Sequence, residues 1–218
     1  MRIPPAILAI GRNYADHAAE MGGKTDERPM VFMKNPASVC RNGDAIVIPS
    51  ICREGGPQVD FEGELAIEIA HDCCDVAEGD EMSVIAGYRV ANDVSARWWQ
   101  KSGSGGQFCR GKSFNTFCPM TELVARGAID DPQDLEIETI LNGERMQFAS
   151  TKLMVFPVRY LIRELSRGMT LTAGTIILTG TPAGVGAGRT PPLYLKDGDT
   201  IEVRIARVGH LINRVHEA

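Results

Sequence analysis

The sequence predicts a β-rich α+β fold. Short candidate strands outnumber candidate helices, and the two kinds do not alternate regularly along the 218 residues. A doubly wound parallel sheet requires regular alternation, so this pattern argues against that class. The 23 glycines and 12 prolines follow no period, which predicts many turns and no internal repeat. With 44% apolar residues, a chain of 218 residues can bury one sizeable core, and we predict a single domain over residues 1–218.

The strand prediction depends on short runs rich in apolar and β-branched residues. The runs are Ala6–Ile10, Met30–Met33, Ala45–Ile48, Glu64–Ala70, Ile85–Ala91, Leu135–Leu141, Thr175–Thr179, Thr200–Ala206 and His210–Val215. Asn142-Gly143 predicts a hairpin turn, because both residues tolerate positive φ. Lys196-Asp197-Gly198-Asp199 is a second turn signal.

Three helices are predicted, over Asn13–Met21, Val94–Lys101 and Pro157–Arg167. The last has the clearest pattern, with proline at its start and Gly168 after its end. Its apolar residues Val158, Leu161, Ile162 and Leu165 recur at helical spacing.

Composition excludes several classes of protein. Lys plus Arg number 23 against 28 Asp plus Glu, a net charge of −5, which argues against generic nucleic-acid binding. No apolar run approaches the ~20 residues that span a bilayer, and the N-terminus lacks the features of a signal peptide. The six cysteines contain no Cys-x-x-Cys pair, so we predict no structural zinc. They are expected to be reduced, mostly buried thiols of a cytoplasmic protein.

Gly106–Ser113 matches the spacing of a phosphate-binding loop, G-x-x-x-x-G-K-[ST]. That loop works when it joins a strand to the N-terminus of a long helix. Here the flexible segment Ser102–Gly106 precedes it, and Phe114–Pro119 follows with poor helix propensity. We predict that the segment does not bind nucleotide, and we keep a nucleotide-binding module as the alternative from another functional class.

Acidic residues suggest a site at the start of the strand Glu64–Ala70. Glu62 and Glu64 are two residues apart, so in a strand they point to the same side, and Gly63 between them adds no bulk. Asp93 follows the apolar run Ile85–Ala91. Three oxygen ligands without a Cys or His ligand set suit Mg²⁺ or Mn²⁺ better than zinc. On spacing alone, a solvated acidic strand edge explains the pattern better, because acidic pairs at i, i+2 are common.

His17 and Glu20 form a second pair. In a helix the i, i+3 spacing places them on one face. A carboxylate beside an imidazole orients it and raises its pKa, which suits a general base. A surface pair without function is the alternative interpretation.

Five motifs in this order resemble the fumarylacetoacetate hydrolase family. They are Gly11-Arg12-Asn13-Tyr14-Ala15-Asp16-His17, Phe61-Glu62-Gly63-Glu64-Leu65-Ala66, Asn92-Asp93-Val94-Ser95-Ala96-Arg97, Gly111-Lys112-Ser113-Phe114 and Thr179-Gly180-Thr181-Pro182-Ala183-Gly184-Val185-Gly186. The similarity runs from about residue 7 to the C-terminus. The family contains hydrolases, decarboxylases and isomerases of 2-oxo acids, so the motifs indicate the family better than the reaction.

The resemblance implies a rolled or barrel-like mixed sheet with a few short helices, and a homodimer. It implies a divalent cation, Mg²⁺ with Mn²⁺ as the alternative, held by Glu62, Glu64 and Asp93. It makes His17 and Glu20 a catalytic dyad on a short lid helix, with Lys112 as a third catalytic residue. The substrate contacts that it implies are Arg12, Asn13, Arg97, Gln100, Gly180 and Thr181.

The chain departs from the family pattern after Arg97, where Trp98-Trp99 replaces an acidic and an aliphatic residue, and at Asn115, where Asp is frequent. We interpret the two tryptophans as packing of the helix after Asp93.

The sequence therefore predicts a Mg²⁺-dependent hydrolase of carbon–carbon bonds in a small 2-oxo acid. The expected substrate is an acylpyruvate such as fumarylpyruvate, a kind of intermediate in the catabolism of aromatic compounds. Cleavage would release pyruvate through a metal-stabilised enolate. Oxaloacetate decarboxylation and isomerisation of 2-hydroxyhepta-2,4-diene-1,7-dioate are alternatives on the same scaffold. A catalytically silent member of the family is a further one.

Overall fold

The computed structural model describes residues 2–218, and its centre is a mixed eight-stranded sheet curved into a half-barrel. The strands run in the order β2 (Met30–Lys34), β1 (Ile7–Gly11), β13 (Ile176–Leu178), β6 (Gly63–Ile69), β7 (Ile85–Asn92), β9 (Cys118–Met120) and β3 (Val39–Arg41), with β10 (Val124–Ala125) also beside β7. β1 runs parallel to β13, whereas β13, β6 and β7 are antiparallel neighbours. The predicted β-rich class with a rolled mixed sheet is confirmed.

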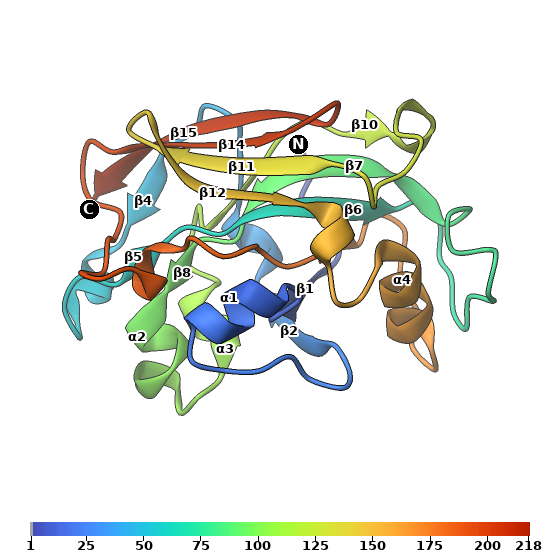
Figure 1. Cartoon of the computed structure of the whole chain (residues 1–218), viewed down its shortest axis with the longest axis horizontal. Helices are drawn as coiled ribbons and strands as arrows, with labels where there is room; N and C mark the ends of the chain where they lie inside the picture. The colour runs from blue at the N-terminus through green and yellow to red at the C-terminus, as the bar shows by residue number, and fades with distance from the viewer. Residues whose placement is uncertain (1) are drawn as a thin grey trace.

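A second, five-stranded sheet packs against the first. Its order is β12 (Glu144–Ser150), β11 (Glu136–Leu141), β14 (Thr200–Ile205), β15 (Gly209–Glu217) and β4 (Ile46–Ile48). Figure 1 shows these strands as an upper layer over β6 and β7. The turn at Asn142-Gly143 joins β11 to β12, and both residues have positive φ, as predicted for this hairpin.

Within residues 2–218, four α-helices lie outside the sheets: α1 (Ala15–Glu20), α2 (Arg97–Gln100), α3 (Phe108–Gly111) and α4 (Val158–Ser166). The 3₁₀ turns are Pro36–Ser38, Ser50–Arg53, Ser102–Ser104, Arg126–Ala128, Thr151–Leu153 and Gly186–Gly188. No helix in the described part of the chain combines the length and the apolar character that a membrane span requires.

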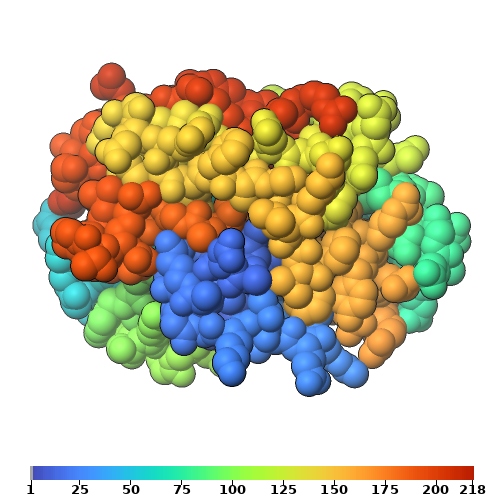
Figure 2. Space-filling view, viewed as in Figure 1, coloured from blue at the N-terminus to red at the C-terminus, as the bar shows by residue number. Residues whose placement is uncertain are grey.

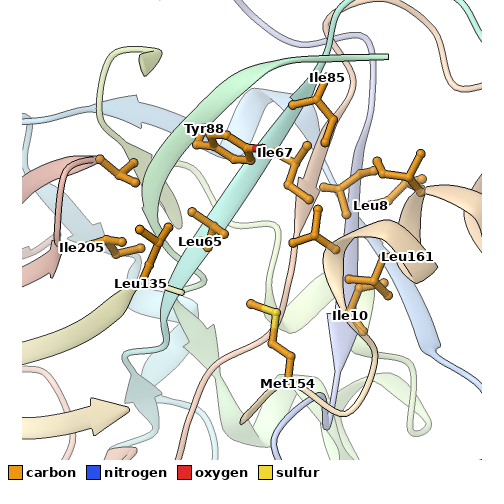
Figure 3. Packing of buried hydrophobic residues seen from close by; sticks show 14 of the residues in the cluster. Leu8, Ile10, Leu65, Ile67, Ile85, Tyr88, Leu135, Met154, Leu161 and Ile205 are labelled. Carbon is orange, nitrogen blue, oxygen red and sulfur yellow. The ribbon is translucent and has the colours of Figure 1, made fainter. Parts of the chain in front are cut away.

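The main core fills the space between the two sheets. Leu65 and Ile67 from β6, Tyr88 from β7 and Ile205 from β14 meet there, as Figure 3 shows. Helix α4 closes one side with the apolar face that the sequence predicts, since Leu161 and Ile162 are fully buried. Because strand residues alternate in direction, Glu64, Ala66 and Glu68 point to the opposite side of β6 from Leu65 and Ile67.

One predicted element needs correction. The predicted helix Val94–Lys101 is helical only over Arg97–Gln100, because Ser95–Ala96 forms the short strand β8, which pairs with β5 (Val59–Asp60). Strands β3, β5, β9 and β10 were not predicted, since two or three residues are too few to show an alternating pattern. All six thiols are free, and three of them are buried, fewer than expected.

Candidate functional site

Three buried carboxylates meet at one end of the half-barrel. Glu62, Glu64 and Asp93 each bring one oxygen into a group whose members lie within 4.8 Å of one another. The register of β6 and β7 brings them together: Gly63 pairs with Asn92, and the Asp93 amide donates to the Glu62 carbonyl oxygen at 2.8 Å. None of the three is more than 5% exposed, so the alternative of a solvated strand edge is wrong.

Buried cations compensate two of the three acids. The Lys112 ammonium donates to Glu62 Oε2 at 2.8 Å and to Asp93 Oδ2 at 2.6 Å. Lys34, at the end of β2, donates to Asp93 Oδ1 at 2.5 Å and is 1% exposed. Arg97 Nη1 donates to Glu62 Oε1 at 2.6 Å. Burial alone would raise the pKa of Glu62, but the charges of Lys112 and Arg97 outweigh burial and hold that pKa well below its ordinary value.

Glu64 is the one of these three acids that forms no ion pair within residues 2–218. Its Oε2 accepts the Gly180 N–H at 2.7 Å. Burial raises its pKa well above the ordinary value, and the negative charges of Asp93 and Glu62 raise it further. A buried carboxyl group in this position must hold a proton or share a cation.

The site fits a divalent cation. Among the described residues, four buried carboxylates, counting Asp60 two residues before Glu62, lie with three buried cations, so with all four acids ionised the cluster is one positive charge short of neutrality. Glu62, Glu64 and Asp93 would hold the cation, and oxygen is the ligand atom that Mg²⁺ and Mn²⁺ prefer. The residues present are therefore chemically suited to the predicted metal.

The predicted dyad lies on helix α1 beside this cluster. His17 Nδ1 is 3.3 Å from Glu20 Oε2, and the Gly184 N–H donates to the Glu20 carboxylate at 2.9 Å. His17 is only 7% exposed, and its charge is among the causes that lower the pKa of Glu62, so the imidazole lies within electrostatic range of that carboxylate. Helix α1 therefore packs into the structure with His17 and Ala18 buried and with Glu20 held by Gly184.

The segment 180–188 provides backbone donors for three acids, one on helix α1 and two in the stretch 60–64. The Gly180 N–H binds Glu64, the Gly184 N–H binds Glu20, and the Gly186 N–H binds Asp60 at 2.7 Å. Gly180 and Gly184 have φ of +96° and +106°, which side-chain-bearing residues rarely adopt. Figure 2 shows the blue N-terminal segment with α1 lying against the orange segment that contains these glycines.

The predicted substrate contacts divide into two groups. Arg97 and Gln100 lie at the carboxylate cluster, where Arg97 Nη1 also donates to Gln100 Oε1 at 3.1 Å. Arg12 is partly exposed beside α1, and its guanidinium is 3.7 Å from Asp26. Gly180 offers its N–H to Glu64, as described above, and the Thr181 hydroxyl donates to the Gly63 carbonyl oxygen at 2.9 Å. In this structure Gly180 and Thr181 therefore position the start of β6.

Asn13 does not fit the substrate-binding role that the resemblance implies. It is fully buried, and its amide nitrogen donates to the carbonyl oxygens of Phe156 and Thr179. Its Oδ1 accepts the Phe156 N–H at 2.7 Å. Because backbone groups occupy both ends of the amide, Asn13 anchors the entry to α1.

The Gly106–Ser113 segment has, within the described residues, no strand leading into it and no long helix after it. Gly105 and Gly106 turn the chain with positive φ, and α3 contains only four residues. Lys112, which a phosphate-binding loop would direct at phosphates, is 2% exposed and bound to Glu62, Asp93 and Ser95. The geometry therefore supports the prediction that this segment is not a nucleotide site.

Two site residues escaped the sequence analysis. Asp60 carries a detectable signal, since it continues the alternation of Glu62 and Glu64 backwards by two positions. Lys34 ends a predicted strand without any motif, and only the three-dimensional structure brings it to Asp93.

The fold and the site together define a β-rich enzyme class with a buried carboxylate cluster that could hold a metal ion, next to a short helix that carries the His17–Glu20 pair. The chain belongs to the fumarylacetoacetate hydrolase family, because the family domain "Fumarylacetoacetate (FAA) hydrolase C-terminal" matches residues 6–216.

The chain is similar to several proteins whose names state an activity. The chain is 44% identical to oxaloacetate tautomerase YisK of Bacillus subtilis over 212 residues, 96% of this chain and 69% of the relative. It is 41% identical to the mitochondrial oxaloacetate tautomerase FAHD2B of Bos taurus, over 97% of this chain and 67% of the relative. The solved 5-carboxymethyl-2-hydroxymuconate delta-isomerase of Mycobacterium smegmatis is 36% identical with a TM-score of 0.85, over 99% of this chain and 80% of that one. These relatives are named as tautomerases and an isomerase, so they do not single out the acylpyruvate hydrolase predicted from the sequence, and the alternatives on the same scaffold fit them as well or better.

Proposed function

We propose that this protein is a divalent-metal-dependent tautomerase of a small 2-oxo dicarboxylic acid of the oxaloacetate type. The observation that carries the proposal is a general base, His17, buried with its orienting carboxylate beside an oxygen-rich cation site. The tautomerase relatives support this substrate class.

The charge of the site suits an anionic substrate. With a divalent cation added, the carboxylate cluster changes from a deficit of one positive charge to an excess of one. A bound Mg²⁺ would supply positive charge to the 2-oxo oxygen as negative charge develops there. Lys112 and Arg97 keep Glu62 ionised, so the cation site stays formed at neutral pH.

His17 is the candidate base for proton transfer. Its Nδ1 faces Glu20, which leaves Nε2 for the substrate. In the keto-to-enol direction, Nε2 takes the proton from the carbon next to the carbonyl, and the C–H electron pair forms the C=C bond as the carbonyl π pair moves to oxygen. Return of one proton to that oxygen completes the enol. Glu20 stabilises the imidazolium between the two transfers.

The alternatives differ in what they add to this proton transfer. Isomerisation of a hydroxydiene-dioate moves the proton along a longer conjugated acid, and the M. smegmatis isomerase supports it as the second candidate. Hydrolysis of an acylpyruvate such as fumarylpyruvate needs an activated water in addition. The closed site, with His17 7% exposed, suits reactions without that water.

The test compares His17→Asn with the wild-type protein, using oxaloacetate as substrate in the presence of Mg²⁺. The measured quantity is the rate of keto–enol interconversion above the uncatalysed background. Loss of a positioned base should lower kcat by about 10²–10⁴-fold. His210→Asn is the matched control, because His210 is exposed and paired with Glu202 away from the site. Equal tautomerase activity of His17→Asn and wild type would contradict the proposal.

A substrate panel separates the alternatives on one preparation. Oxaloacetate, fumarylpyruvate and a hydroxydiene-dioate are assayed together, and carbon dioxide release measures decarboxylation. A thermal-shift comparison of Mg²⁺ plus oxalate with Mg²⁺ plus ATP tests the remaining class, since a ligand that binds the folded state raises its melting temperature. Stabilisation by oxalate and none by ATP is the expected result.

A further inference from the structure

Asp60 is a buried carboxylate on which four donors converge. Its Oδ1 accepts the N–H groups of Phe61 at 2.8 Å and Gly186 at 2.7 Å. Its Oδ2 accepts Arg97 Nε at 2.8 Å and the Ala187 N–H at 2.9 Å. The residue is 0% exposed. Since every one of these partners is a donor, an asparagine in either amide orientation would direct its NH₂ group at two other donors.

The contact of Asp60 with Arg97 connects it to the cation site. Arg97 lies between two acids: Nε and Nη2 face Asp60, while Nη1 donates to Glu62 Oε1 at 2.6 Å. The guanidinium is a planar fork, so fixing one edge fixes the direction of the other. Asp60 therefore sets where Arg97 meets Glu62.

The contacts of Asp60 with the backbone of Gly186 and Ala187 connect it to Glu20 of helix α1. Gly186 and Ala187, which donate to Asp60, follow closely after Gly184, whose N–H holds Glu20. The segment lies tightly on Asp60, because a Cβ added at Gly186 would be 2.7 Å from Asp60 Oδ1. Asp60 thus holds the backbone that positions the dyad.

We propose that Asp60 is a positioning residue that aligns the cation ligand Glu62 through Arg97 and the dyad acid Glu20 through residues 184–187. This inference rests on the proposed metal site. Asp60 also balances the charge of Arg97. Without Asp60, Arg97 would neutralise Glu62 alone and weaken it as a ligand for a cation. Partners that orient metal ligands from behind typically change metal affinity or activity by about 10–100-fold when they are removed.

The first experiment titrates Mn²⁺ into the metal-free protein and follows free Mn²⁺ by electron paramagnetic resonance. Asp60→Asn should raise the Mn²⁺ dissociation constant by about 10–100-fold. Asp199→Asn is the matched control. Asp199 is also buried, at 3% exposure, and accepts hydrogen bonds from Asn142 and from the Lys196 N–H, away from the site residues. This control should lower the melting temperature and leave Mn²⁺ affinity unchanged.

A second variant keeps the test decisive if Asp60→Asn does not fold. Asp60→Glu retains two acceptor oxygens and the charge, displaced by one methylene, so it should fold and bind Mn²⁺ more weakly than wild type. Wild-type Mn²⁺ affinity in Asp60→Glu, or in folded Asp60→Asn, would overturn the positioning role. Failure of the wild-type protein itself to bind Mn²⁺ would remove the metal site and this inference with it, so the two failures are distinguishable.

Discussion

Glu64 differs from its two neighbouring acids in forming no ion pair with another described residue. Replacing it with the isosteric amide, Glu64→Gln, removes a buried charge and a cation ligand together. We expect loss of Mn²⁺ binding and of activity, together with a gain of about 0.5–2 kcal/mol in the free energy of unfolding of the metal-free protein, because functional sites often hold unfavourable charge. Metal titration and chemical denaturation measure the two effects.

The control for this prediction is four residues along the same strand. Glu68 points to the same side of β6 as Glu64, but it pairs with Arg89 at 2.6 Å. Glu68→Gln should keep Mn²⁺ affinity and should not stabilise the fold. A Glu64→Gln protein that is less stable than metal-free wild type would show that Glu64 is compensated in some other way.

At the level of single residues, the sequence predicted the carboxylates and the dyad better than their surroundings. Spacing alone places Glu62 and Glu64 together, and the structure confirms it, since their carboxylates lie in one group. Spacing cannot show that Lys34 crosses from β2 to Asp93, because that contact depends on the curvature of the whole sheet. It also cannot distinguish an asparagine that contacts substrate from one that anchors backbone, as Asn13 does.

Among the elements, the segment 180–188 can be tested by adding a single methyl group. A Cβ at Gly188 would overlap Glu20 Cγ and lie 2.5 Å from its Oε1, so Gly188→Ala must displace the dyad acid. We expect kcat to fall about as far as in Glu20→Gln, with little change in Mn²⁺ affinity. Gly127→Ala is the control, since no atom of the described residues lies within 4 Å of its added Cβ. Unchanged kcat in Gly188→Ala would argue against a role for Glu20.

Helix α1 should open and close on its own. It has six residues, which is too short for a stable isolated helix, and Gly22 and Gly23 follow it closely. Because His17 is buried in this structure, we expect substrate to reach it only when α1 moves. Hydrogen exchange of residues 15–29 should be faster than that of β6 in the free protein, and Mg²⁺ plus oxalate should slow it. Equal exchange with and without these ligands would show that α1 is not a lid.

For the molecule as a whole, the charge of the cluster predicts a dependence of stability on pH. The folded-state pKa of Glu64 is raised, so between its ordinary and raised values the folded protein binds more protons than the unfolded chain. The free energy of unfolding therefore falls as pH rises through that window. Mg²⁺ should remove this decline, because it stabilises the ionised carboxylate. Calorimetry across that pH window, with chelator and with Mg²⁺, measures the pH dependence of stability. Identical pH profiles under the two conditions would contradict the charge deficit of the cluster.

The fold class was predictable because it depends on many weak signals that agree. The longer strands and α4 show clear periodicity, whereas the pairing of β3 with β9, or of β5 with β8, joins segments too short to carry a pattern. The helix expected over Val94–Lys101 does not begin at Val94, because a strand partner distant in sequence overrides the local helix propensity there. The homodimer that the resemblance implies stays a prediction, which sedimentation equilibrium would test.

The alternation of Asp60, Glu62 and Glu64 also constrains how this chain can change in length. All three reach the site, while Phe61 and Leu65 between and beyond them are fully buried in apolar clusters. One inserted or deleted residue would exchange these two sets, directing carboxylates into the core and apolar side chains at the cation site. A substitution in this stretch changes a single side chain, whereas an insertion or deletion of one residue reverses the direction of every side chain that follows it. Insertions and deletions should therefore be tolerated at exposed turns such as Asn142-Gly143 and eliminated between residues 60 and 65.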